Sequence, residues 1–242
     1  MGRAKLRMMG FSPPLEVLES AEAVARRGAQ LIAQHLREAD AARGRATFAV
    51  SGGRTPTLML RLVARESLPW AHLELFQVDE RVAPEGHTDR NATAIRAALW
   101  AQCQLYPERF HWMPVERPDL AAAVRDYELT LRTFAGTPAV LDVIHLGLGD
   151  DGHTASIFPG AAPTDDAAAD VTLTEVHLGR RRITLTMAAI NRARFIVWIV
   201  TGREKQQVLA RLLAADPDLV ASHVRATDVA ILADFAAAGR TA

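Results

Sequence analysis

A glycine-rich stretch at residues 145–160 (HLGLGDDGHTASIFPG) places one histidine beside two carboxylates. Histidine suits a general base near neutral pH, because its unperturbed pKa is about 6.5. Asp151 precedes His153 by two residues and could orient the imidazole. The stretch therefore predicts acid–base chemistry with His153 and Asp151 at its centre. The alternative is a structural one, with Asp150 as a helix N-cap and His153 solvated.

The same stretch also spells G-x-G-x-x-G through Gly147, Gly149 and Gly152, the pattern of a dinucleotide-binding turn. In such a turn the pyrophosphate sits against backbone amides at a helix start. Here Asp150 and Asp151 occupy that position, and two carboxylates repel a pyrophosphate. We therefore expect no dinucleotide cofactor. The glycines, Gly149 among them, are expected to let the backbone turn tightly and approach a ligand.

A second turn, residues 51–56 (SGGRTP), has the features of a phosphate cradle. It follows an apolar run, and Pro56 suits the first turn of a helix. Glycine allows close approach, and a helix N-terminus supplies N–H donors. The turn lacks the G-K-[ST] of a nucleotide P-loop, which favours a single phosphate monoester; an ordinary strand–helix turn is the alternative. The residues expected to contact substrate here are Ser51, Gly52, Gly53, Arg54 and Thr55.

A third polar turn, residues 78–84 (VDERVAP), places Asp79 and Arg81 at the end of an apolar strand. The plain alternative is a surface ion pair, the commonest fate of such charges. A metal site is not expected, since the chain has neither H-E-x-x-H nor a Cys/His cluster. A serine hydrolase is not expected either, because G-x-S-x-G is absent.

Composition excludes several classes of function. The 242 residues contain 28 basic and 28 acidic side chains, so neither a nucleic-acid nor a membrane partner is expected. Cys103 is the only cysteine, which excludes an internal disulfide and fits a reducing compartment. The first ten residues lack the apolar core of a signal peptide. These features predict a soluble cytoplasmic protein, a monomer or weak homo-oligomer. Only two bases are lysine, Lys5 and Lys205, so a lysine is more informative here than an arginine.

Apolar runs that alternate with helical patterns must position these turns. A helix is expected from Ser20 to about Gly44, with further helices from Thr55, over 91–100, from Pro118 and over 203–215. The expected strands are 45–51, 72–80, 139–149, 170–178, 181–187, 194–202 and 228–234. This order predicts an α/β fold: one Rossmann-like domain over 1–242, with a mainly parallel sheet and helices on both faces. Ligands bind at the carboxyl ends of such strands, where the polar turns fall.

Taken together and in order, these segments resemble the 6-phosphogluconolactonases. The matching pieces are SGGRTP, QVDERVAP, LGLGDDGHTASIFPG, RRITLTMAAINRARFIVWIVTGREK and DVAILADFAAA, which span about three quarters of the chain. The resemblance implies a Rossmann-like, cofactor-free esterase of the oxidative pentose phosphate pathway that acts on a small sugar-phosphate lactone. Two segments depart from the family pattern. Arg90-Asn91-Ala92 stands where Ser-Asn-Tyr is usual, and Val220 replaces a usual proline.

The resemblance also implies roles for the residues. His153, oriented by Asp151, would take a proton from water as the water attacks the C1 carbonyl. Arg81 or a turn N–H would stabilise the carbonyl oxygen, while Asp79 would bind sugar hydroxyls or position Arg81. The residues left to contact substrate are Asn91 and Gly149 and, at the far end beside the SGGRT turn, Arg182 and Lys205 on the 6-phosphate. Lys205 is expected on the first turn of a helix, where a cation needs an anionic partner.

Two other functions share this pattern. The related glucosamine-6-phosphate deaminases have a similar glycine turn, but a run like I-A-F-N-E-P follows their histidine and contains a glutamate for ring opening. HTASIFPG has no carboxylate, which favours the lactonase. Sugar-phosphate-sensing domains of transcription regulators normally follow a DNA-binding helix-turn-helix. The expected long helix before the first expected strand leaves no room for one.

Overall fold

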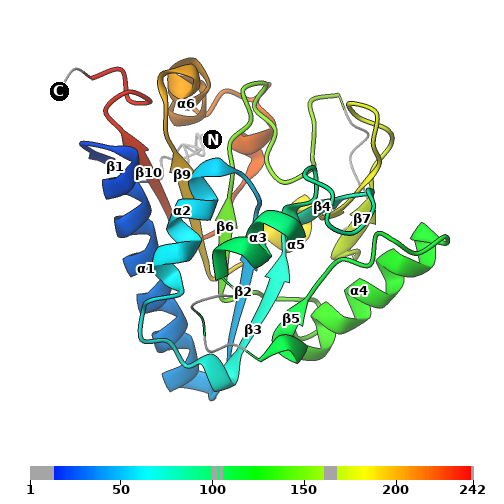
Figure 1. Cartoon of the computed structure of the whole chain (residues 1–242). Coiled ribbons are helices and arrows are strands. Elements are labelled where there is room, and N and C mark those ends of the chain that lie inside the picture. The colour runs from blue at the N-terminus through cyan, green and yellow to red at the C-terminus, as the bar shows by residue number, and fades with distance from the viewer. Residues whose placement is uncertain (1–13, 100–102, 104–105, 161–167, 241–242) are drawn as a thin grey trace, which may run out of the picture.

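A seven-stranded parallel sheet forms the centre of the protein. The computed structural model describes residues 14–99, 103, 106–160 and 168–240. The strands of this sheet are β1 (Leu15–Leu18), β2 (Ala46–Val50), β3 (Leu73–Gln77), β5 (Phe110–His111), β6 (Val143–Leu146), β9 (Phe195–Val200) and β10 (Val229–Asp234). They lie in the order β1-β10-β9-β6-β2-β3-β5, and every neighbouring pair is parallel. Their carboxyl ends therefore meet at one edge, the upper edge in Figure 1.

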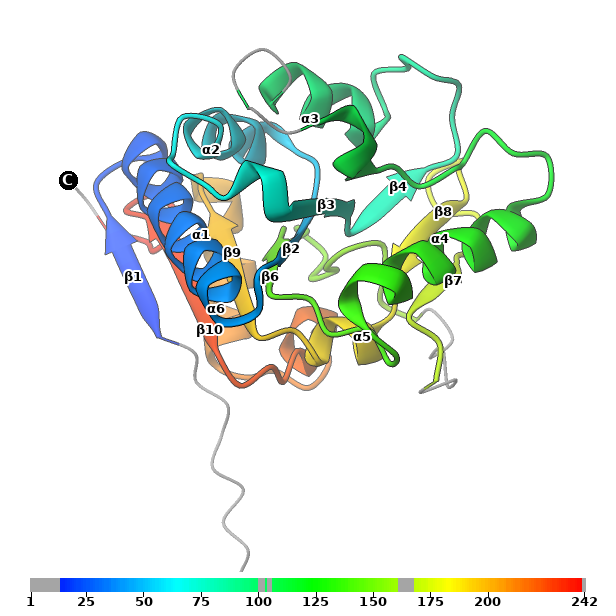
Figure 2. The same cartoon turned by 90° about the horizontal axis from the view of Figure 1, so that it is seen from below.

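Helices cover both faces of this sheet (Figures 1 and 2). They are α1 (Ala21–Arg43), α2 (Arg54–Val63), α3 (Asn91–Leu99), α4 (Leu120–Ala135), α5 (Met187–Asn191) and α6 (Gln206–Leu213). The first three helices pack with β2 side chains such as Phe48 in one apolar core, and the last three pack with Ile144 and Trp198 in another. The expected fold class is confirmed.

The end signals of α1 show how the sequence sets an element. Ser20 Oγ accepts a hydrogen bond from the Ala23 amide at 3.2 Å, which satisfies one of the free N–H groups at the helix start. Gly44 ends the helix with φ +67°, a conformation that glycine adopts without strain. The helix expected from Ser20 to Gly44 is confirmed.

The single strand expected over 72–80 is wrong, because the chain changes sheet at Val78. β3 belongs to the large sheet, whereas β4 (Asp79–Arg81) belongs to a three-stranded antiparallel sheet in the order β4-β8-β7. The Val78 amide donates to Val50 O at 3.0 Å, and its carbonyl accepts from the Leu185 amide at 2.8 Å. This one residue therefore joins both sheets. The strands β7 (Val171–Leu173) and β8 (Arg182–Leu185) were expected as strands, but not as a second sheet.

Other elements also differ from expectation. The sequence predicts neither β1, which is the first strand and pairs with β10, nor β5, which pairs with β3. The helix expected over 203–215 begins as a 3₁₀ turn, η3 (Arg203–Lys205), before α6. The expected helix end at residue 100 lies outside the described residues. The remaining 3₁₀ turns are η1 (Trp70–His72), η2 (Pro107–Arg109) and η4 (Val220–His223).

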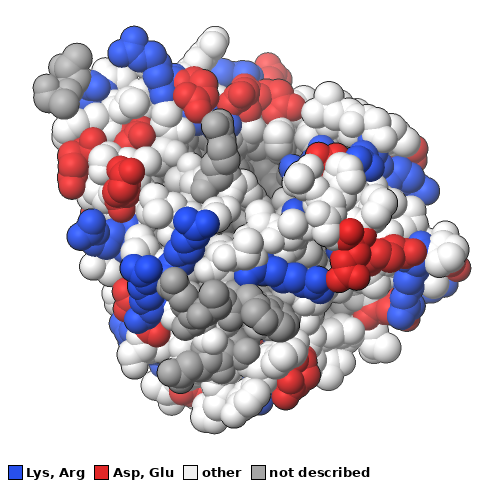
Figure 3. Space-filling view, viewed as in Figure 1, with Lys and Arg blue, Asp and Glu red and all other residues white. Residues whose placement is uncertain are grey.

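The equal numbers of basic and acidic residues are reflected on the protein surface. Basic and acidic groups are interspersed on the face shown in Figure 3. Among the described residues, no helix is both long enough and apolar enough to cross a membrane.

Candidate active site

A cavity of about 340 Å³ opens at the carboxyl ends of β2, β6 and β9. It collects residues from the three polar turns and from the segment 199–205 at the end of β9. The expected site residues that line it are Ser51, Gly52, Gly53, Thr55, Asp79, Arg81, Asn91, Gly149, His153, Arg182 and Lys205. Asp151 is not among the lining residues, and the side chain of Arg54 lies outside the described part of the structure.

His153 and Asp151 are in direct contact beside the cavity. His153 Nδ1 lies 2.5 Å from Asp151 Oδ1, and the His153 amide donates to the same oxygen at 3.1 Å. With Nδ1 held by the carboxylate, Nε2 is the nitrogen left for a water or a substrate. Burial alone would raise the pKa of Asp151, but the hydrogen bonds from the His153 amide and ring lower it from its ordinary value. The carboxylate therefore stays ionised near neutral pH.

Gly149 allows this contact because a side chain has no room there. A Cβ built on Gly149 would lie 2.1 Å from His153 Nδ1 and 2.7 Å from Asp151 Oδ1. The Gly149 amide also donates to the His153 carbonyl at 2.9 Å, which closes the turn. The predicted close approach is therefore between this backbone and the histidine itself.

Hydrogen bonds connect a second group of polar side chains, from β4, β8, the start of α3 and the turn after β6. Arg81 Nη1 donates to Asn91 Oδ1 at 2.8 Å, and Asn91 Nδ2 donates to Asp79 Oδ1 at 3.1 Å. Ser156 Oγ lies 2.5 Å from Asp79 Oδ2 and 3.4 Å from Arg182 Nη1. Asp79 and Arg81 are joined through Asn91, with no direct hydrogen bond between them among the described residues. Ser156 was not singled out from the sequence, because a serine inside a turn motif has no feature that marks it as buried.

The sequence predicts Arg182 at the far end of the cavity, but the structure places it beside Arg81. The two residues are direct cross-strand partners on β4 and β8. The Nε of each is buried and has no hydrogen-bond partner among the described residues. Burial, and then the neighbouring Arg81 charge, lower the pKa of Arg182 from its ordinary value. A bound anion would offset both effects, so this wall is suited to a negatively charged ligand.

The turn at residues 51–56 presents the start of α2 to the cavity. Gly53 is the N-cap, with φ +132° and no side-chain cap on the helix. Ser51 Oγ donates to the His145 carbonyl at 3.1 Å, and Thr55 Oγ1 lies 2.7 Å from Thr201 Oγ1. Both hydroxyls thus also hold the framework. Gly52 is required because a Cβ there would lie 2.0 Å from Asn91 Oδ1.

Lys205 reaches the cavity from the last position of η3. Its Nζ donates to Asp150 Oδ1 at 2.6 Å and to the Leu148 carbonyl at 2.7 Å. The alternative of a helix N-cap role for Asp150 is wrong, because the described residues that follow Asp150, up to 160, form no helix. No cluster of three or more His, Cys, Asp or Glu side chains suited to a metal ion is found in the described ranges.

Comparisons with known proteins agree with this geometry. The family model "Glucosamine-6-phosphate isomerases/6-phosphogluconolactonase" matches residues 19–232. The chain belongs to this family. It is 35% identical over 212 residues to a 6-phosphogluconolactonase of Synechocystis sp., covering 86% of this chain and 88% of that protein. It is 33% identical over 213 residues to one of Pseudomonas aeruginosa, covering 84% and 87%.

A solved structure of the family has the same fold. The 6-phosphogluconolactonase from Trypanosoma cruzi superposes with a TM-score of 0.83 at 25% identity, covering 96% of this chain and 97% of that one. A monomeric glucosamine-6-phosphate deaminase has a TM-score of 0.79 at 18% identity, which shows the shared fold alone.

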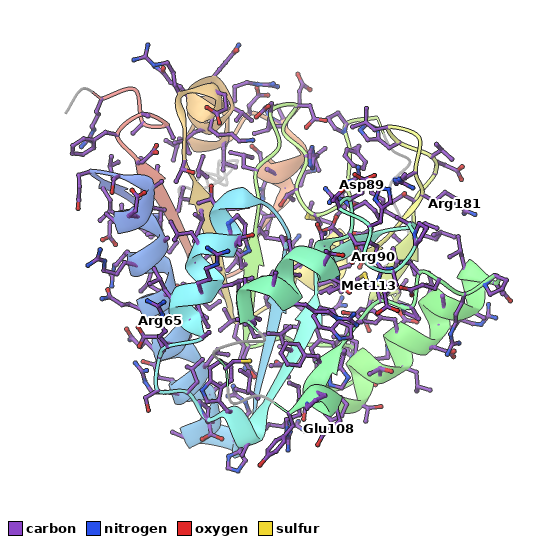
Figure 4. All side chains as sticks on the ribbon, in the orientation of Figure 1. Arg65, Asp89, Arg90, Glu108, Met113 and Arg181 are labelled. Atoms are coloured by element: carbon purple, nitrogen blue, oxygen red, sulfur yellow. The ribbon has the colours of Figure 1, made fainter. Side chains whose placement is uncertain are left out.

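Arg90, at one departure from the family pattern, does not line the cavity. Its guanidinium is buried, lies 3.2 Å from Glu80 Oε2 through Nε, and also pairs with Glu116 and the Ala83 carbonyl. Glu80 in turn accepts hydrogen bonds from the amides of Asn91 and Ala92, the first residues of α3. Asp89 and Arg90 are the last two residues of the loop from β4 into α3 (Figure 4). Arg90 therefore holds Glu80, which in turn caps the start of the helix that carries Asn91.

Phe158, in the stretch where a deaminase-like chain has its glutamate, packs in an aromatic cluster instead. Its ring lies 4.8 Å from that of His153 and stacks on His177 at 3.6 Å. The Arg182 guanidinium lies 4.9 Å above the same ring. An apolar ring thus borders both the histidine and the arginine wall.

Proposed function

We propose that this protein hydrolyses 6-phospho-D-glucono-1,5-lactone to 6-phosphogluconate in the oxidative pentose phosphate pathway, with His153 as the general base. The observation that carries the proposal is the 2.5 Å contact between His153 Nδ1 and Asp151 Oδ1 at the cavity wall. The family members that the chain resembles over most of its length are 6-phosphogluconolactonases. We also propose that the protein is cytoplasmic, because its proposed substrate is a charged sugar phosphate of central metabolism.

A lactone is an activated ester, so water needs only a positioned base and a stabilised oxyanion. His153 Nε2 takes a proton from water as the oxygen attacks C1, and ionised Asp151 stabilises the imidazolium that forms. Arg81, held by Asn91, donates to the carbonyl oxygen as it becomes negative. The C1–O5 bond then breaks, and the ring oxygen receives a proton, which His153 can return.

The 6-phosphate is held by the free amides at the start of α2, together with Arg182 and Lys205. The helix N-terminus carries partial positive charge, and Gly52 and Gly53 let an anion approach the backbone. Arg182 contributes its Nε, which has no hydrogen-bond partner among the described residues. Asp79 and Asn91 are placed to bind sugar hydroxyls.

Two parallel assays test this activity. 6-Phosphogluconolactone and glucosamine 6-phosphate are supplied separately, and acid and ammonia release are followed. We expect acid release from the lactone above the spontaneous rate and no ammonia. Ammonia release without lactone hydrolysis would overturn the proposal and assign a deaminase.

A further inference from the structure

Lys205 and Asp150 form an ion pair that no step of the proposed reaction uses. They come from different turns, Asp150 after β6 and Lys205 after β9, and both line the cavity. Lys205 Nζ donates to Asp150 Oδ1 at 2.6 Å and to the Leu148 carbonyl at 2.7 Å. An ammonium has three N–H donors, so one remains for a ligand. Asp150 thus accepts one of the three N–H donors with which Lys205 could bind a ligand in the cavity.

The two partners differ in how free they are to move. The Lys205 side chain is 23% exposed, whereas that of Asp150 is 71% exposed. The lysine is also tied to a backbone carbonyl. The aspartate has Lys205 as its one side-chain partner among the described residues and can turn into solvent. If a stronger anion arrives at Lys205, Asp150 is therefore the group that yields.

We propose that Asp150 is a specificity-determining residue that competes with phosphate for Lys205. The proposal rests on the assignment of Lys205 to the 6-phosphate in the proposed function. A phosphate monoester carries a charge of about −1.5 to −2 at neutral pH. When one of its oxygens accepts from Lys205 Nζ, it lies beside a carboxylate bonded to the same nitrogen. Like charges at this separation oppose one another, so phosphate must displace Asp150 or bind less tightly.

This competition favours ligands that are anchored at more than one place. A phosphorylated lactone also contacts Arg81, Asn91 and the groups around His153 through its sugar ring, and these contacts offset the displacement of Asp150. Inorganic phosphate lacks them and bears the whole effect. Asp150 therefore keeps the site from being occupied by free phosphate.

The test is the affinity for inorganic phosphate, measured by calorimetry at fixed ionic strength and without turnover. Asp150→Asn keeps the shape of the side chain and removes its charge. We expect the variant to bind phosphate roughly 5- to 30-fold more tightly than the wild type. Glu204→Gln is the matched control, because Glu204 lines the same cavity and forms no ion pair with Lys205 among the described residues. We expect it to change the affinity by less than about 2-fold.

A second background shows whether the effect acts through Lys205. In Lys205→Ala, phosphate binding should be weaker, and adding Asp150→Asn should change it little, since the competed group is gone. Unchanged or weaker binding by Asp150→Asn alone would overturn the proposal and make Asp150 a support for Lys205. An equal gain in phosphate affinity in Glu204→Gln would overturn the proposal, because it would show that removing any negative charge beside the cavity has the same effect. Unchanged binding in Lys205→Ala would instead remove Lys205 from the phosphate site. None of these results depends on lactone hydrolysis.

Discussion

Asp151 Oδ1 accepts hydrogen bonds from both the backbone and the ring of His153, at 3.1 Å from the amide nitrogen and 2.5 Å from Nδ1. One carboxylate oxygen therefore fixes the position and the orientation of the imidazole together. The ring is bordered on another side by Phe158, whose centroid lies 4.8 Å away. A base held in this way loses little freedom when it takes a proton, which is what general-base catalysis requires.

The first prediction concerns this histidine. His153→Asn should lower kcat by about 10²- to 10⁴-fold, the usual contribution of a positioned acid–base group, and change KM much less. Because the lactone also hydrolyses spontaneously, initial rates of acid release are corrected at each pH for the rate without enzyme. A folded variant with near-normal kcat would show that another group activates the water.

The second prediction uses two neighbouring glycines. A Cβ at residue 149 would lie 2.1 Å from His153 Nδ1, whereas one at residue 147 would meet nothing within 4 Å. Gly149→Ala should therefore displace the imidazole and lower kcat by about 10- to 100-fold, since a misplacement of about 1 Å has an effect of this order. Gly147→Ala leaves the imidazole in place and adds a methyl group to the cavity that Gly147 lines, so it should change KM and keep kcat within about 2-fold. Equal losses in both variants would attribute the effect to turn flexibility and not to the position of His153.

The third prediction separates the carbonyl from the phosphate. Arg182→Ala and Lys205→Ala should each lose roughly 10- to 100-fold in kcat/KM on the phosphorylated lactone, the scale of a charge-assisted hydrogen bond. On unphosphorylated gluconolactone these losses should largely vanish. Arg81→Ala should lose activity on both lactones, because it acts on the carbonyl. Since Arg81 and Arg182 are cross-strand partners, an Arg182→Ala loss that is equal on both lactones would mean that the two arginines act together on the carbonyl.

The sequence was most informative where local chemistry decides the structure. Ser20 and Gly44 bound α1 as their capping preferences predict, and the D-G-H turn places His153 and Asp151 in contact. Strand ends on a parallel sheet share one edge, so the gathering of the polar turns followed from the order of the elements.

Features that depend on tertiary packing could not be predicted in the same way. The change of sheet at Val78 depends on its bonds to Val50 and Leu185, which lie far apart in the sequence. For the same reason, the sequence placed Arg182 at the far end of the site, while β4–β8 pairing places it opposite Arg81. The ion pair of Lys205 with Asp150 joins two loops whose spacing no local pattern encodes.

The last prediction concerns His145 on β6, two residues before Gly147 of the cavity lining. Its side chain is fully buried, and neither ring nitrogen has a hydrogen-bond partner among the described residues. Burial lowers the pKa of His145 from 6.5 to about 3. The folded protein therefore keeps this ring neutral between these values, while the unfolded chain takes up a proton as the pH falls below about 6.5. Protonation then favours unfolding, so His145 lowers the stability progressively as the pH falls from 6.5 towards 3.

Urea unfolding at pH 7 and pH 5 measures this effect. Between these values, one proton bound only by the unfolded chain lowers the free energy of unfolding by about 2 kcal/mol. His145→Leu should therefore lose about 2 kcal/mol less than the wild type over this interval. The control is His223→Gln, which removes an exposed histidine that forms no ion pair among the described residues and shows how far a histidine substitution by itself changes the pH dependence. The same pH dependence in His145→Leu and the wild type would show that His145 binds a proton equally in the folded and unfolded chains, against the desolvation that its burial implies.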